Sequence, residues 1–149
     1  MITRYVNGLY PADLWVGFYS DFDKAKRMFY FFYDVEGLRK NEEPEDLIPT
    51  IAPGTGGVTY LVRLKKDNAK GILILLNESV LEDDYTYILD LVSHEASHAV
   101  DAVYQIIREQ PGNYDSGNEP HAYLTGWVAG CVGDTLTKYF KEDGSEEIW

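Results

Sequence analysis

The feature that most constrains the fold of this chain is a set of apolar residues at three- and four-residue steps in its second half. The set consists of Leu89, Val92, Ala96, Ala99, Val103 and Ile106. Because an α-helix turns once in about 3.6 residues, this spacing puts the six side chains on one face. It predicts a long amphipathic helix from about residue 84 to residue 109, ended by Pro111 and Gly112.

Segments that could pack against this helix come both before and after it in the sequence. Apolar runs at 14–19, 58–64 and 71–76 predict strands, and a polar turn between the last two makes a hairpin their simplest pairing. A last helix is expected over 119–140. Strands early and long helices late predict one α+β domain over 1–149, with a small, mainly antiparallel sheet and helices on one face.

The segment after the first strand predicts a shorter helix. Ser20 is in position to cap its start. Four residues then fall on one face of this predicted helix: Phe22, Ala25, Phe29 and Phe32. Further on, PGTGG at 53–57 lacks the lysine and hydroxyl residues of a phosphate-binding loop, so we expect a flexible turn or at most a lid.

Charge and composition limit the partners of the chain. A net charge of −12 disfavours electrostatic binding to nucleic acid or to an anionic membrane. No apolar run approaches the roughly 20 residues of a membrane span, and the N-terminus lacks the pattern of a signal peptide. The single cysteine, Cys131, excludes an internal disulfide and is expected to be a small buried apolar residue. We therefore expect a cytoplasmic protein with neither kind of partner.

The sequence SHEASHAVD, within the long predicted helix, carries the chemistry. His94 and His98 are four residues apart, so they project from one helix face at a spacing that lets two imidazoles reach one tetrahedral zinc ion. Glu95 lies about 100° round the helix from His94, beside such a metal, where it could accept a proton from water. The alternative is an ordinary helix with two surface histidines.

A zinc site needs a third ligand, and three residues compete for roles near it. Asp101 shares the histidine face but lies about 10 Å along the axis from His94, so it is expected to orient an imidazole rather than bind metal. Glu119 opens the last predicted helix and is the favoured third ligand. His121 is the alternative, although it points about 200° away from Glu119 on a helix.

HEASH followed by NEPHAY resembles the gluzincin group of HExxH zinc metallopeptidases, in which a glutamate on a later helix supplies the third ligand. Asn118 before Glu119 adds to this resemblance. The pair is also similar to small zincin-like proteins encoded by phages and prophages. The resemblance covers about residues 73–127, and we expect no separate C-terminal domain of the kind that larger gluzincins have.

The resemblance implies a minimal zincin-like fold and zinc held by the two histidines and Glu119. It implies hydrolysis of a peptide or protein substrate, with Glu95 as general base. An extended substrate is expected along an edge strand, which we assign to residues 71–76. Tyr123, one turn after Glu119, could hydrogen-bond an oxyanion, although a packing role competes.

The alternative function is a metal-binding structural or interaction domain that uses the same fold without turnover. Glu95 counts against this alternative, because a purely structural zinc site needs no base beside it. A DNA-associated zincin protein would need a basic binding module, and between residues 77 and 120 the chain has ten carboxylates and one arginine.

Overall fold

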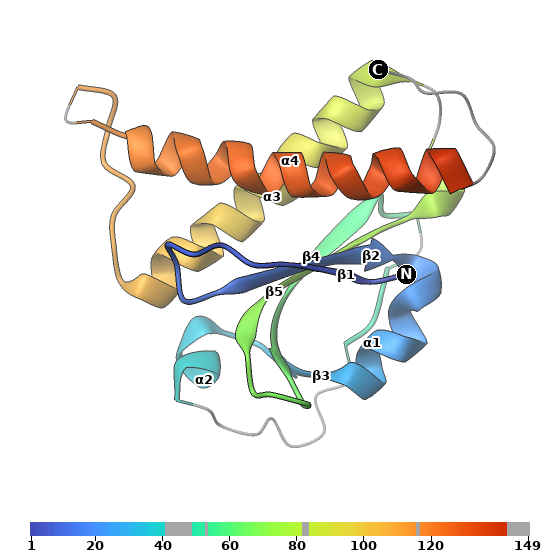
Figure 1. The fold of residues 1–149 in the computed structure, drawn as a ribbon, viewed down its shortest axis with the longest axis horizontal. Helices are drawn as coiled ribbons and strands as arrows, with labels where there is room; N and C mark the ends of the chain where they lie inside the picture. The colour runs from blue at the N-terminus through green and yellow to red at the C-terminus, as the bar shows by residue number, and fades with distance from the viewer. Residues whose placement is uncertain (41–48, 53, 82–83, 116, 143–149) are drawn as a thin grey trace.

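The computed structural model describes residues 1–40, 49–52, 54–81, 84–115 and 117–142 (Figure 1). The strands are β1 (Thr3–Tyr5), β2 (Asp13–Phe18), β3 (Phe29–Phe32), β4 (Gly57–Leu64) and β5 (Lys70–Leu76). The helices are α1 (Phe22–Met28), α2 (Val35–Arg39), α3 (Tyr85–Ile107) and α4 (Glu119–Glu142), with short 3-10 turns at Tyr19–Asp21 and Glu78–Val80.

The strands form one sheet in the order β1-β2-β5-β4-β3. β4 and β5 pair antiparallel as the predicted hairpin, and among the described strands only the pairing of β2 with β5 is parallel. β5 is the central strand, and residues 71–76 are all buried. Its uninterrupted apolar run is typical of a strand that is covered on both faces. The prediction of a small, mainly antiparallel sheet is confirmed.

The two long helices cover the same face of the sheet, and α4 crosses α3 obliquely there (Figure 1). Their core joins Val16, Ile74, Val100 and Val128, among others. This arrangement confirms the α+β prediction. None of the helices in the described ranges is long and apolar enough to cross a membrane.

The opposite face of the sheet has its own smaller core, to which α1 contributes Ala25. The predicted helix there was too long. It ends at Met28, and Phe29 and Phe32 belong to β3, where pairing with β4 satisfies their backbone groups. The predicted cap was also one residue early, because Asp21 rather than Ser20 precedes α1.

α3 begins and ends close to the predicted residues. The Asp84 side chain caps it by accepting a hydrogen bond from Thr86 N, and Arg108 ends it in the left-handed conformation. Most of the predicted apolar face is buried, but Leu89 is 61% exposed. Its neighbours Ile88 and Leu91 are buried in the core instead.

Candidate functional site

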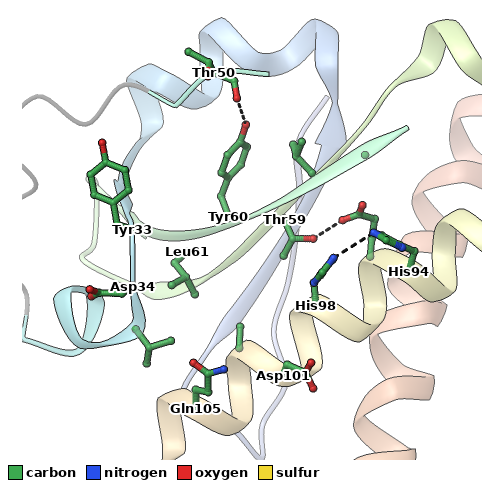
Figure 2. A pocket seen from close by; sticks show the side chains of 15 residues that line it. Tyr33, Asp34, Thr50, Thr59, Tyr60, Leu61, His94, His98, Asp101 and Gln105 are labelled. Carbon is green, nitrogen blue, oxygen red and sulfur yellow. Dashed lines mark hydrogen bonds between the residues drawn. The ribbon is translucent and has the colours of Figure 1, made fainter. Parts of the chain in front are cut away.

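The two motif histidines project from consecutive turns of α3 toward β4. Both side chains are exposed, and Figure 2 shows their rings close together on the side of α3 that faces Thr59. The Nε2 atoms of His94 and His98 are 3.2 Å apart. The predicted convergence of the two imidazoles is therefore present in the structure.

The distance between these nitrogens suits a shared metal ion. Two nitrogens that each lie 2.0–2.1 Å from a tetrahedral zinc are about 3.3 Å apart. The same 3.2 Å separation would also suit a hydrogen bond between one protonated and one unprotonated ring nitrogen. The pair thus has the donor type and the spacing of two zinc ligands.

Glu95, between the histidines in sequence, is buried against β4. It is 2% exposed, and its Oε2 accepts a hydrogen bond of 2.5 Å from the Thr59 hydroxyl. A Cβ atom added at Gly57 would lie 3.0 Å from Glu95 Oε1. The carboxylate therefore fits between a hydroxyl donor and a bare α-carbon, and a side chain at position 57 would crowd it.

Charge on Glu95 also affects a neighbouring phenol. Burial raises the pKa of Tyr19, and the negative charge of Glu95 adds to that rise, whereas a hydrogen bond to Thr55 opposes it. Tyr19 and Thr55 are joined by a hydrogen bond of 2.6 Å. Tyr19 therefore stays protonated at neutral pH and adds no charge beside the carboxylate.

A groove of about 630 Å³ runs between α3, β4 and the start of α2. Its wall on α3 consists of His94, Glu95, His98, Asp101, Ala102 and Gln105. Residues 57–61 of β4 line the facing side, and Tyr33, Asp34, Val35 and Thr50 complete it (Figure 2). The groove brings the exposed histidines and Glu95 together with a strand of the sheet.

The first residues of β4 have an outer edge along this groove that no described strand covers. β3 pairs only with residues 61–64, so among the described residues no strand covers the outer edge of residues 57–60. Hydrogen bonds from Leu64 N to Ala69 O and from Asn77 N to Gly56 O show that even-numbered residues of β4 face β5. The backbone N–H and C=O of Gly57 and Thr59 therefore face the open side.

This arrangement corrects the predicted substrate strand. Residues 71–76 cannot be an edge, because β5 is paired with β2 on one side and β4 on the other. The open edge beside the histidines belongs to β4 instead. Of the predicted flexible turn, Pro53 lies outside the described residues, whereas Gly56 accepts a hydrogen bond from Asn77 N and Gly57 starts β4.

Glu119 is not brought to the histidines. α3 continues from His98 to Ile107, about 13 Å further along the axis, before the chain turns back. Glu119 is exposed in the first turn of α4, and the adjoining Pro120 lies near Tyr104 at that far end. Across the described residues, no group of three or more His, Cys, Asp or Glu side chains is placed to hold a metal ion.

The other predicted site residues occupy separate places. The ring of His121 packs against that of Tyr104, with centroids 5.5 Å apart. Tyr123 is 75% exposed and lines a different groove, beside Leu9 and Trp127. Asp101 does line the histidine groove, but its carboxylate makes no hydrogen bond to an imidazole in the described structure.

Thr59 and Gly57 are the residues of this site that the sequence reading missed. A signal was present, because alternation in VTYLVRL places Thr59 on the same sheet face as Leu61. A polar side chain on that face needs a partner, but the sequence does not identify Glu95 as that partner.

Comparisons of the chain with protein-family models, with curated proteins and with solved structures found no match.

Proposed function

We propose that this chain is a zinc-dependent metallopeptidase whose general base is Glu95. The observation that carries the proposal is the pair of Nε2 atoms, 3.2 Å apart on His94 and His98, beside a groove that Glu95 also lines. Two convergent imidazoles alone would suit a binding site, but a carboxylate beside them adds a base for hydrolysis.

His94 and His98 would hold the zinc ion. Glu119 is the third ligand that the resemblance implies, and to reach the ion it would have to lie closer to His98 than it does in the structure. A zinc ion supplies Lewis acidity, which lowers the pKa of water and polarises a peptide carbonyl. Support for Glu119 comes from its place in the HEASH and NEPHAY pair rather than from its position in the fold. Asp101 is the nearest competitor by location, because it lines the same groove.

Glu95 is suited to move a proton during hydrolysis. It would accept a proton from the attacking water and return it to the leaving amine. Burial at 2% exposure limits the bulk water around the carboxylate, and the hydrogen bond from Thr59 restricts its orientation. A base held in this way needs little rearrangement when substrate arrives.

The proposed substrate is an extended peptide segment. The N–H and C=O groups of Gly57 and Thr59, which no described strand pairs, can add such a segment to the sheet as a further strand. A segment in that position would pass Glu95 and the histidines, because all of them line one groove. The carbonyl to be cleaved would then lie beside the base.

Metal analysis tests the site. Purified protein should contain about one zinc ion per chain, and His94→Ala with His98→Ala should abolish binding. His121→Ala is the matched control, since it removes an imidazole that packs on Tyr104. Comparison of Glu119→Ala and Asp101→Ala with this control would show which of the two carboxylates contributes to zinc binding. Unchanged metal content in the double histidine variant would refute the zinc proposal.

Cleavage of a broad peptide library tests the activity. Zinc-loaded protein should hydrolyse internal peptide bonds, and a chelator should stop the reaction. A fully loaded protein that cleaves no member of the library would instead favour a metal-binding domain without turnover. The metal analysis and the library therefore test the two parts of the proposal separately.

A further inference from the structure

We propose that Thr59 is a positioning residue that holds the Glu95 carboxylate in its working orientation. The catalytic consequence rests on the proposed function, whereas the contact itself does not. The Thr59 Oγ1 atom donates to Glu95 Oε2 across 2.5 Å. A separation this short is typical of a hydroxyl that donates to an ionised carboxylate, and such hydrogen bonds are stronger than neutral ones.

The helix alone does not fix this carboxylate. The backbone of α3 sets the direction of the Cα–Cβ bond of Glu95, but the torsions beyond it remain free to rotate. The sheet removes that freedom from two sides. Thr59 binds Oε2, and the α-carbon of Gly57 lies where any side chain would crowd Oε1. The orientation of the base is therefore determined by β4.

Thr59 also links the base to the substrate edge. Its backbone N–H and C=O face the open side of β4, where the proposed peptide would pair. Its side chain meanwhile faces α3 and Glu95. A peptide that pairs with Thr59 is thus placed relative to the base by a single residue. Removal of the Thr59 hydroxyl should change the orientation of the Glu95 carboxylate but leave the backbone contacts of the peptide intact.

The kinetic test compares two substitutions at Thr59. Thr59→Val keeps the shape but loses the donor, and it should lower kcat about 10- to 100-fold with KM nearly unchanged. Thr59→Ser keeps the donor and should restore most of kcat. Thr55→Val is the matched control, because its hydroxyl bonds Tyr19 and Ala52 rather than Glu95.

Non-additivity shows whether Thr59 acts through Glu95. In a Glu95→Gln background, Thr59→Val should lower the remaining kcat by less than twofold, because the base is already absent. An equal loss in both backgrounds, or a failure of Thr59→Ser to restore kcat, would overturn the positioning role.

A second test needs no cleavage and therefore separates this proposal from the peptidase proposal. Thr59→Val leaves a buried carboxylate without its hydrogen-bond donor. Urea denaturation should therefore show an equilibrium constant for unfolding that is about 10- to 100-fold larger, the effect expected when a buried polar group loses its partner. Glu95→Met added to it should recover at least part of that loss. If Thr59→Val costs no more than Thr55→Val and Glu95→Met recovers nothing, Thr59 does not hold Glu95.

Discussion

The two halves of β4 are parts of one strand with different surroundings. In the second half, residues 61–64 pair with β3, and Val62, Arg63 and Leu64 are buried. In the first half, residues 57–60 are only partly buried, and no described strand pairs with their outer edge beside the histidines of α3. The difference follows from the length of β3, which ends at Phe32.

The comparison shows how one short neighbour strand can separate a structural region from a functional one. Where β3 continues, the backbone of β4 is satisfied and its side chains fill the core. Where β3 stops, the same backbone is available to a ligand. The candidate site therefore depends on the end of β3 as well as on the HExxH sequence.

The largest expected effect concerns Glu95, the residue of α3 that contacts Thr59 in the open half of β4. Glu95→Gln keeps the size of the side chain but removes its basicity, so kcat for peptide cleavage should fall about 10²- to 10⁴-fold. Zinc content and thermal stability should stay close to those of the parent, because Glu95 is not a proposed ligand. Steady-state kinetics with metal analysis on the same samples would measure both. A Glu95→Gln protein as active as the parent would show that another group is the base.

The next effect concerns stability and contrasts the two halves directly. Leu64 is 7% exposed in the covered half, so Leu64→Ala should lower the free energy of unfolding by about 2–5 kcal/mol. Val58→Ala removes a half-buried side chain from the open half and should cost clearly less. Urea denaturation of both variants provides the measurement. Equal losses at the two positions would contradict the contrast in packing.

Amide hydrogen exchange can test the open edge without substitution. The amide of Thr59 should exchange faster than those of Leu61 and Arg63, which face β3 on the same side of the strand. The amides of Val58 and Tyr60 should be protected, because they face β5. NMR can follow each of these amides. Slow exchange at Thr59 in the isolated protein would mean that its edge is covered.

The smallest expected effect concerns charge in the groove. Asp34 and Asp101 line it, and none of its described lining residues is lysine or arginine. Asp101→Asn should raise KM for a lysine-containing peptide about two- to fivefold and leave kcat unchanged. This is the effect expected when one exposed ion pair is lost. Asp90→Asn is the control, because Asp90 is exposed on α3 outside the groove. Equal KM changes in the two variants would exclude a local role for Asp101.

Local patterns predicted most of the fold. The periodicity of α3 and the alternation of β4 depend on neighbouring residues, so they could be read from the chain. FYFF could not be assigned in that way, because a short aromatic run suits a buried helix or a strand, and only pairing with β4 decides. The central place of β5 likewise depends on β2, a partner far away in sequence.

The same difference between local patterns and contacts of residues far apart in sequence applies to the candidate site. The convergence of His94 and His98 was predictable, since both belong to one helix. The separation of Glu119 from His98 was not, because no local pattern shows where the first turn of α4 lies against α3. The contact between Thr59 and Glu95 joins a strand to a helix, and no local pattern identifies such a pair.

The bare α-carbon at Gly57 has a consequence for how this chain can evolve. Alanine at that position would crowd Glu95, while loss of the Thr59 hydroxyl would leave the same carboxylate without its donor. Substitutions at these three positions should therefore be epistatic: a change at one is accepted only after a compensating change at another. If Glu95 were replaced by a residue without a carboxylate, neither the small residue at position 57 nor the hydroxyl at position 59 would be needed for it. In descendants that keep the two histidines but lose the glutamate between them, we expect positions 57 and 59 to vary independently of each other.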